Sequence, residues 1–246
     1  MDVHNQINDK NVSFVVLVGG LSSRIKHLYP NKPKPLIEIE NKPFLYWLVK
    51  EIETLNFKNV IYATGYKSYQ IETWVKNNEF NKLNQKIVKE KTKLGTAGSV
   101  FNLINICKDN LIILNGDTFL VGGIKALIES INLKHSCSLV CHHMKNTEKF
   151  GRIIFNKKNK LINFIEKKKG GPGYINSGIY YFKKEKIIKY KINGCVSLEY
   201  QLIPSMIKNN EEINVIKINK PKFIDIGTED SIIESKKKAQ KILFYD

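Results

Sequence analysis

Short apolar runs and amphipathic stretches alternate along the first half of the chain. The apolar runs have the length of strands that are buried on both faces of a parallel sheet. They lie at 14–18, 59–64, near 85–89 and at 110–114. Apolar residues recur at helical spacing in the stretches between them, over 43–56, near 68–78 and near 96–107. This alternation predicts an α/β fold in which right-handed crossovers join parallel strands.

The second half of the chain is richer in strand patterns. Four such segments follow residue 135: SLVCHHM (138–144), GRIIF (151–155), KLINFI (160–165) and YINSGIYYF (174–182). We expect them to add antiparallel strands to the sheet, and we expect a final amphipathic helix over 228–243. The predicted fold is a Rossmann-like, doubly wound mixed sheet, mostly parallel with antiparallel additions in the C-terminal half. Residues 1–13 are polar and predict a flexible tail before a single domain over 14–246.

Composition narrows the class of partner. The chain has 246 residues, of which 42% are hydrophobic, so it can bury a full core. Forty Lys and Arg against 23 Asp and Glu give a formal charge of +17, which attracts nucleic acid, anionic membranes or phosphorylated small molecules. The lysines fall in scattered runs without a basic helix or strands rich in aromatic residues. We therefore expect solvated lysines and neither nucleic acid nor a membrane as partner.

The four cysteines and the absence of a leader pattern favour a reducing cytoplasm. Cys137 and Cys141, with His142 and His143, suggest a zinc site. However, SLVCHHM has the pattern of a strand and no second pair of ligands follows at finger spacing, so packing in the core is favoured. The longest apolar stretches are far too short to cross a membrane. We expect a soluble cytoplasmic protein.

Polar side chains follow three of the predicted parallel strands. Gly19 and Gly20 come after the first strand, Gly65 and Tyr66 after the second, and Asn115-Gly116-Asp117 after the strand at 110–114. Ligands of open α/β sheets bind at the carboxyl ends of such strands, where the strand order reverses. These residues are therefore predicted to share one site.

The loop after the first strand has the chemistry of a phosphate cradle. Gly19 and Gly20 allow close approach to the backbone, Ser22 and Ser23 offer hydroxyl donors, and Arg24 offers a charged fork. The loop lacks both GxxxxGK[ST] and GxGxxG, which argues against an ATPase or dinucleotide mechanism. A plain turn is an alternative for the glycines, but it does not account for Lys34, which is stiffened between two prolines.

Eight segments in matching order resemble the sugar-phosphate nucleotidyltransferases over residues 14 to about 232. They are GGLSSR (19–24), PKPL (33–36), LGTAGSV (94–100), NGDTF (115–119), FGRI (150–153), IEK (165–167), NSGIY (176–180) and FIDIGT (223–228). Within the family the chain is most similar to guanylyltransferases acting on D-glycero-alpha-D-manno-heptose 1-phosphate or mannose 1-phosphate. Two residues depart from the family pattern: Ser22 stands where glycine is usual, and Lys168 stands where proline is usual.

The resemblance implies that a sugar 1-phosphate attacks the α-phosphate of a nucleoside triphosphate and releases pyrophosphate. It assigns catalysis to Arg24, Lys34 and Asp117, and a Mg²⁺ cofactor to Asp117 and Asp225. It also implies that residues 14–122 form mainly the nucleotide-binding half of the domain and that residues 123–246 form mainly the sugar-phosphate-binding half. The nucleotide contacts implied are Val18, Gly19, Gly20, Ser22, Ser23, Gly65, Tyr66, Glu90, Gly95, Thr96 and Ala97. The sugar-phosphate contacts implied are Gly151, Glu166, Lys167, Asn176 and Gly178.

The carboxylate of Glu90 indicates which base the bound nucleotide carries. An ionised carboxylate can accept hydrogen bonds from both N1–H and N2–H of guanine, whereas uracil offers a single imide N–H. The expected nucleotide is GTP, and the expected sugar is a heptose destined for a surface polysaccharide. Two alternatives stay open: the same chemistry with CTP, UTP or dTTP and another sugar, polyol or molybdopterin phosphate, or a non-catalytic nucleotide-binding relative. The apolar segment PFLYWLV (43–49) is a candidate homodimer face.

Overall fold

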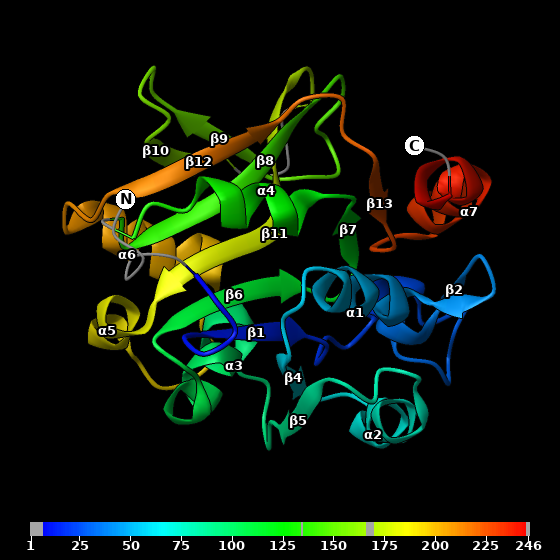
Figure 1. Ribbon diagram of the computed structural model, residues 1–246. Coiled ribbons are helices and arrows are strands. Elements are labelled where there is room, and N and C mark those ends of the chain that lie inside the picture. The colour runs from blue at the N-terminus through cyan, green and yellow to red at the C-terminus, as the bar shows by residue number, and fades with distance from the viewer. Residues whose placement is uncertain (1–6, 134, 166–169, 245–246) are drawn as a thin grey trace.

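A mixed β-sheet with helices on both faces forms the centre of the molecule (Figure 1). The computed structural model describes residues 7–133, 135–165 and 170–244, and within them the sheet has nine strands. Four strands from the first half run parallel in the order β6-β1-β4-β5. They are β1 (Val12–Leu17), β4 (Asn59–Thr64), β5 (Asn84–Lys89) and β6 (Asn110–Asn115). The chain thus winds outward from β1 and then returns to its other side.

The second half extends the sheet beyond β6. The long strand β11 (Gly173–Lys183) runs antiparallel to β6, and β8 (Cys137–Met144) runs antiparallel to β11. The hairpin of β9 (Arg152–Phe155) and β10 (Leu161–Ile165) joins the start of β11. An additional strand, β12 (Ile213–Ile218), lies parallel to β8. The predicted mixed sheet is confirmed.

The helices cover the two faces because apolar residues fill both sides of each central strand. In β1, Phe14 and Val16 contact one core, and Val15 contacts the other. The first core is covered by α1 (Phe44–Thr54), α2 (Ser68–Asn77), α4 (Gly123–Ser130) and α7 (Glu229–Leu243). The second is covered by α3 (Gly95–Leu103), α5 (Lys184–Ile187) and α6 (Ile203–Lys208). The result is a three-layer α/β/α arrangement.

Short elements occupy the connections. The 3₁₀ turns η2 (Ser23–Ile25) and η3 (Lys34–Leu36) and the small ribbon of β2 (Glu38–Ile39) and β3 (Lys42–Pro43) follow β1. Two further 3₁₀ turns, η4 (Ile104–Ile106) and η5 (Ile188–Tyr190), follow α3 and α5, and a π-helical turn, η6 (Leu198–Leu202), precedes α6. A separate two-stranded ribbon pairs β7 (Thr118–Leu120) with β13 (Phe223–Asp225), joining segments about a hundred residues apart.

Three expectations need correction or restriction. The strand β1 begins at Val12, so the boundary predicted after residue 13 falls two residues late; residues 1–6 lie outside the described part of the chain. In the segment PFLYWLV, Phe44 is buried, and Trp47 is partly buried and packs edge-on against Phe244 at 5.5 Å. A homodimer through this segment stays a prediction.

Three members of the cysteine and histidine cluster belong to the core, whereas His143 is exposed. Cys137 and Cys141 are buried, and the Nδ1 of His142 is hydrogen-bonded to the Ser177 hydroxyl at 2.9 Å. Burial lowers the pKa of His142 to about 4. No group of three or more His, Cys, Asp or Glu side chains suited to a metal occurs in the described residues. Among those residues, no helix is both long and apolar enough to span a bilayer.

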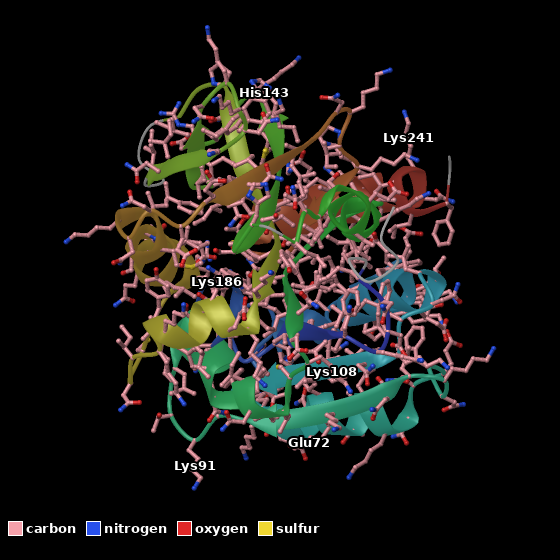
Figure 2. The ribbon with its side chains drawn as sticks, turned by 60° about the vertical axis from the view of Figure 1, so that its left-hand side comes forward. Glu72, Lys91, Lys108, His143, Lys186 and Lys241 are labelled. Carbon is pink, nitrogen blue, oxygen red and sulfur yellow. The ribbon has the colours of Figure 1, made fainter. Side chains whose placement is uncertain are left out.

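The lysines are mostly on the outside. Lys91 and Lys241 lie at the periphery of the molecule and extend away from the ribbon (Figure 2). Several pair with exposed carboxylates, as Lys32 does with Glu38 at 2.8 Å and Lys149 with Asp230 at 2.8 Å. Such exposed pairs contribute little to stability.

The carboxylate of Glu51 is expected to make the free energy of unfolding depend on pH. Glu51 on α1 accepts a hydrogen bond from the backbone N–H of Ile124 at 3.1 Å, at the start of α4. Burial raises the pKa of Glu51 to about 7, against an ordinary value of 4.5. The folded state therefore retains a proton that the unfolded state loses, and stability falls as pH rises from about 4.5 to 7.

We expect Glu51→Gln to remove this pH dependence while keeping an acceptor for Ile124. At pH 8 the variant should have a free energy of unfolding higher than wild type by on the order of 3 kcal/mol at most. Urea unfolding at pH 5 and pH 8 measures the difference, with the exposed Glu129→Gln as control. If the free energy of unfolding changes equally between pH 5 and pH 8 in wild type and in Glu51→Gln, the assignment of the pH dependence to Glu51 is wrong.

Candidate active site

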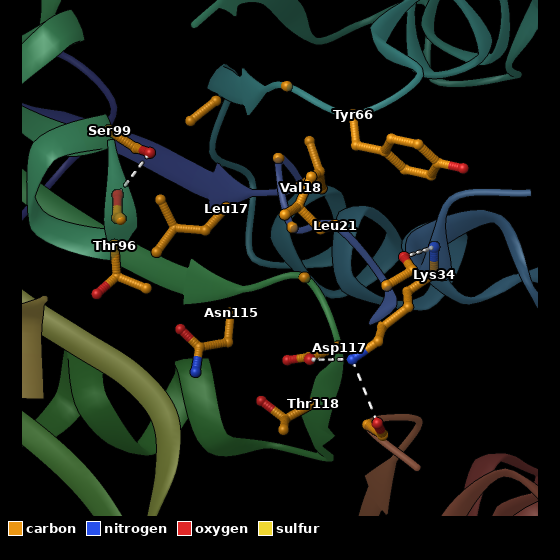
Figure 3. Close-up of a pocket in the computed structure, with 18 of the residues that line it drawn as sticks. Leu17, Val18, Leu21, Lys34, Tyr66, Thr96, Ser99, Asn115, Asp117 and Thr118 are labelled. Carbon is orange, nitrogen blue, oxygen red and sulfur yellow. Dashed lines mark hydrogen bonds and ion pairs between the residues drawn. The ribbon is translucent and has the colours of Figure 1, made fainter. Parts of the chain in front are cut away.

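A cavity of about 780 Å³ opens at the carboxyl ends of β1, β4, β5 and β6 (Figure 3). Its volume is in the usual range for small-molecule sites. It lies where the strand order reverses around β1, as expected for a doubly wound sheet. The described residues that line it include six cationic side chains and four carboxylates: Arg24, Lys34, Lys89, Lys91, Lys93, Lys149, Glu90, Asp117, Glu199 and Asp225.

The two glycines after β1 have different roles. A Cβ atom at Gly19 would lie 3.0 Å from the Oε1 of Glu90, and one at Gly65 would lie 2.5 Å from the same oxygen. A Cβ at Gly65 would also lie 2.9 Å from the carbonyl oxygen of Gly19, so the close approach of these two loops leaves no room for a side chain there. A Cβ at Gly20 would meet no atom within 4 Å, so this glycine faces open space in the cavity. Gly20 is the position where a ligand can approach the backbone closely.

Ser22 connects this loop to Lys34. Its backbone is left-handed, with φ of 56° and ψ of 22°, which explains why glycine is usual at this position in the family. Its buried hydroxyl accepts a hydrogen bond from the backbone N–H of Lys34 at 3.2 Å. Ser22 lines the cavity as predicted, and it also holds the lysine segment. Val18, Ser23 and Arg24 line the same wall.

Lys34 reaches the far side of the cavity from η3. Its side chain is only 11% exposed, and its ammonium group donates to the Oδ2 of Asp117 at 3.4 Å and to the carbonyl of Gly227 at 3.3 Å. Figure 3 shows this side chain extending from its turn to Asp117. The prolines on either side restrict the backbone, so the direction of the side chain is set before a ligand binds.

Asp117 and Asp225 meet at the ends of the β7–β13 ribbon. The backbone N–H of Ile226 donates to the carbonyl of Asp117 at 3.0 Å, which ties the two segments together. The Oδ1 of Asp225 accepts from the backbone N–H of Gly227 at 3.0 Å. Burial, and next the charge of Asp117, raise the pKa of Asp225. Two carboxylates that repel each other are a donor set suited to Mg²⁺, which takes one or two carboxylates together with phosphate oxygens.

Most residues predicted to contact the nucleotide line one side of the cavity, which is called the nucleotide wall below. Tyr66, Gly95 and Thr96 line the cavity together with Glu90. The Oε2 of Glu90 lies 3.0 Å from the Ser99 hydroxyl.

Ala97 was predicted to contact the nucleotide and does not line the cavity. It is fully buried, and its N–H is donated to the carbonyl of Val196 at 2.9 Å. Its assignment as a cavity contact is wrong, because the 194–198 segment covers the start of α3.

The sugar-phosphate wall is described only in part. Gly151 and Asn176 line the cavity. Gly178 does not: it has φ of +77°, and a Cβ atom there would lie 2.4 Å from the Thr118 hydroxyl. Gly178 therefore serves the close approach of β11 to β7. Glu166 and Lys167 lie outside the described residues, as does Lys168.

Several lining residues were missed by sequence reasoning. They include Thr118, Lys149, Glu199 and Tyr200, and the cations Lys91 and Lys93 beside Glu90. The motif NGDTF contains Thr118 beside the predicted Asn115 and Asp117, so this segment carried a usable signal. Glu199 and Tyr200 lie in the π-helical turn η6, which has no recognisable sequence pattern. Only the packing of η6 against α3 brings them to the cavity.

Comparison with known proteins identifies the family. The model of the family described as nucleotidyl transferase matches residues 13–242. The chain belongs to the nucleotidyl transferase family. It is 29% identical to D-glycero-alpha-D-manno-heptose 1-phosphate guanylyltransferase of Aneurinibacillus thermoaerophilus, over 92% of this chain and 97% of the relative. It is 30% identical to the enzyme of the same name from Campylobacter jejuni, over 87% of this chain and 93% of the relative.

Solved structures of similar fold match nearly the whole length of this chain. The crystal structure of HddC from Yersinia pseudotuberculosis matches with a TM-score of 0.81 and 28% identity, over 93% of this chain and 99% of that one. A second structure of HddC, complexed with GMP-PN, has a TM-score of 0.80. The inositol-1-phosphate CTP transferase from T. maritima has a TM-score of 0.77 at 15% identity, a likeness that shows the fold alone. The family match and the two guanylyltransferase relatives confirm the resemblance to sugar-1-phosphate nucleotidyltransferases.

Proposed function

We propose that this nucleotidyltransferase uses GTP and a sugar 1-phosphate, D-glycero-alpha-D-manno-heptose 1-phosphate in particular, and forms a GDP-sugar and pyrophosphate. The observation that carries the proposal is the meeting of Lys34, Asp117 and Asp225 in one cavity, between a wall with Glu90 and a wall with Asn176. The relatives named for this heptose and the HddC complex with GMP-PN support the choice of substrates.

The proposed reaction needs no nucleophile from the protein. An oxygen of the sugar phosphate forms a bond to the α-phosphorus, and the bond from that phosphorus to the bridging oxygen of pyrophosphate breaks. The attacking phosphate has a second pKa near 6 and is mostly dianionic at neutral pH, so it needs no general base. The protein contributes position and positive charge. Lys34 serves the α-phosphate, and Arg24 serves the departing phosphates.

Asp117 and Asp225 would hold the Mg²⁺ ion of this reaction. Bound there, Mg²⁺ would neutralise charge that develops on the phosphate oxygens. The carboxylates would fix the ion beside Lys34, whose ammonium group already lies 3.4 Å from Asp117. Lys34 keeps its position because the Gly227 carbonyl also accepts from it.

Pyrophosphate release tests the function. The purified protein is incubated with Mg²⁺, one of five nucleoside triphosphates (GTP, UTP, dTTP, CTP or ATP) and one of several sugar 1-phosphates, including the heptose, mannose and glucose derivatives. We expect the highest catalytic efficiency for GTP with the heptose 1-phosphate. Turnover with a polyol phosphate or a pyrimidine nucleotide instead would favour the alternative substrates. Nucleotide binding without turnover in any combination would favour a non-catalytic relative.

Glu90→Gln tests the choice of base. The Glu90 carboxylate lines the cavity, backed by Gly19 and Gly65, and can accept from two adjacent guanine donors. An amide offers only one accepting atom and adds a donor. We expect the ratio of catalytic efficiencies for GTP over UTP to fall roughly 10- to 100-fold, the cost of losing one charged hydrogen bond. The exposed Glu79→Gln is the control. An unchanged ratio in Glu90→Gln would show that Glu90 does not read the base.

The proposed compartment of the enzyme is the cytoplasm. A reducing cytoplasm, where thiols stay reduced, fits the four free cysteines. The product would be a nucleotide sugar for a surface polysaccharide. A homodimer remains part of the proposal, with residues 43–49 as its candidate face, in which Tyr46 and Trp47 are partly buried.

A further inference from the structure

A hydrogen-bonded chain in the lining of the cavity joins Thr96 on the nucleotide wall to Asn176 on the sugar wall. At its centre is the carboxylate of Glu199, in the turn η6. Its Oε1 accepts from the hydroxyl of Tyr180 on β11 at 2.7 Å. Its Oε2 accepts from the hydroxyls of Ser197 at 2.9 Å and Thr96 at 3.3 Å. The Tyr180 oxygen in turn accepts from the side-chain amide of Asn176. Three segments distant in sequence, α3, β11 and η6, are thus joined through one carboxylate.

The directions of these hydrogen bonds follow from the carboxylate. An ionised carboxylate only accepts, so each hydroxyl that contacts it must donate its single proton to it. The Thr96 hydroxyl can do so because its oxygen accepts from the backbone N–H of Leu198 at 2.7 Å. The Tyr180 hydroxyl has no second proton, so its oxygen can only accept from Asn176. The chain therefore runs in one direction, from Asn176 through Tyr180 to Glu199.

This direction sets the orientation of the Asn176 amide. The nitrogen Nδ2 must face Tyr180, and the oxygen Oδ1 then accepts from the backbone N–H of Gly178 at 3.1 Å. One N–H and one lone pair of the amide stay available to a ligand in the cavity, which Asn176 lines. Rotating the amide by 180° would place its oxygen against the Tyr180 oxygen and its nitrogen against the N–H of Gly178.

The interior makes this orientation costly to change. Tyr180 is fully buried, and burial, followed by the charge of Glu199, raises the pKa of its hydroxyl well above the ordinary value. The hydroxyl therefore stays protonated as a donor to Glu199. A buried polar group that loses its partner is penalised by more than the bond itself contributes. The network has a defined arrangement only while an acceptor occupies position 199.

We infer that Glu199 is a positioning residue for sugar recognition: its carboxylate, acting through Tyr180, fixes which atoms of the Asn176 amide face the sugar 1-phosphate. The inference rests on the proposed function in placing the sugar phosphate at Asn176. Glu199 acts on Asn176 only through the side chain of Tyr180. The same carboxylate also accepts from Thr96 on the nucleotide wall through its other oxygen, an acceptor that the amide of Glu199→Gln retains when its nitrogen faces Tyr180.

Glu199→Gln replaces an acceptor by a group that also donates. When the new N–H faces Tyr180, the tyrosine hydroxyl accepts from it and turns its own proton toward Asn176, which favours the rotated amide. Tyr180→Phe removes the connection without altering Glu199. Both variants are expected to raise the KM for heptose 1-phosphate about tenfold, the effect of one misplaced hydrogen bond. The KM for GTP and kcat should change less than about twofold. The exposed Glu185→Gln should match wild type.

A double-mutant cycle separates this role from general support of the fold. In an Asn176→Ala background, Glu199→Gln and Tyr180→Phe should cause no further rise in the KM for heptose 1-phosphate, because they act through the missing amide. Effects that simply add in the double variants would overturn the inference. Absence of turnover by wild-type protein would instead refute the proposed function, and it would leave the next measurement decisive for Glu199.

That measurement needs no substrate. The Asn176 side-chain amide gives a ¹⁵N NMR signal that is identified by its loss in Asn176→Ala. In the ligand-free wild-type protein its hydrogen exchange should be slow, because Nδ2 donates to a buried oxygen. Glu199→Gln and Tyr180→Phe should speed this exchange at least about tenfold while backbone amides of β11 stay protected. Unchanged exchange in both variants would overturn the inference whatever the enzyme's activity.

Discussion

Asp117→Asn and Asp225→Asn are each expected to lower kcat about a hundredfold or more at saturating Mg²⁺. The two carboxylates lie together at the ends of β7 and β13, and each supplies a charged oxygen suited to the metal. A metal that stabilises transition-state charge contributes several kcal/mol, and ~3 kcal/mol corresponds to roughly a hundredfold in rate. Steady-state kinetics over a Mg²⁺ titration measure the loss.

The two variants should remain folded. Burial raises the pKa of Asp225, so removing its charge should leave thermal stability unchanged or slightly higher. Asp109→Asn is a matched control, since Asp109 is exposed and precedes the opposite end of β6. Wild-type rates in both aspartate variants would refute the metal assignment, and a collapse in melting temperature would leave a fold defect as the cause.

Lys34→Ala is expected to lower kcat by roughly 10²- to 10³-fold with a smaller effect on the binding of GTP. Removing one preorganised transition-state donor has costs of this size. Lys34 is almost buried and is held by Asp117 and Gly227, so its ammonium group is in place before the substrates arrive. Removing a group whose interactions strengthen only in the transition state lowers kcat more than it weakens binding of the substrate in the ground state.

The matched control for Lys34 lies two residues away. Lys32 is exposed and pairs with Glu38 at 2.8 Å, so Lys32→Ala removes the same charge from the same loop without touching the cavity. Its kinetics should stay within about twofold of wild type. A Lys34→Ala variant with normal kcat and only a raised KM for GTP would reassign Lys34 to substrate binding.

The pattern of apolar residues was sufficient to predict most of the fold. The strands β1, β4, β5 and β6 and the helix α1 were predicted within a few residues. A strand that is buried on both faces leaves a continuous apolar run in the sequence, and a helix that is buried on one face leaves apolar residues at helical spacing. The elements α4, α6 and β12 were not predicted. Each has only six to eight residues, too few for a periodic pattern to stand out.

Motif membership predicted most of the cavity and failed at two positions. Ala97 and Gly178 belong to recognisable motifs, yet the structure uses both for packing. The 194–198 segment covers the N–H of Ala97, and Thr118 lies against Gly178. Nothing within either motif encodes which segment will pack on it. The contact is made by residues at least 60 positions away along the chain.

The sequence by itself determined which residues follow strands, and hence that Gly20, Asp117 and Glu90 gather at one edge of a sheet. This follows because parallel strands present their carboxyl ends together. The resemblance implied that Asp117 and Asp225 share a site, and only the tertiary structure decided how they meet: two three-residue strands pair there through backbone hydrogen bonds that leave no local pattern. The tertiary structure likewise decided the place of Glu199, whose partners come from α3 and β11. Periodicity reports the burial of one segment, whereas a site of this kind depends on which buried segments lie against one another.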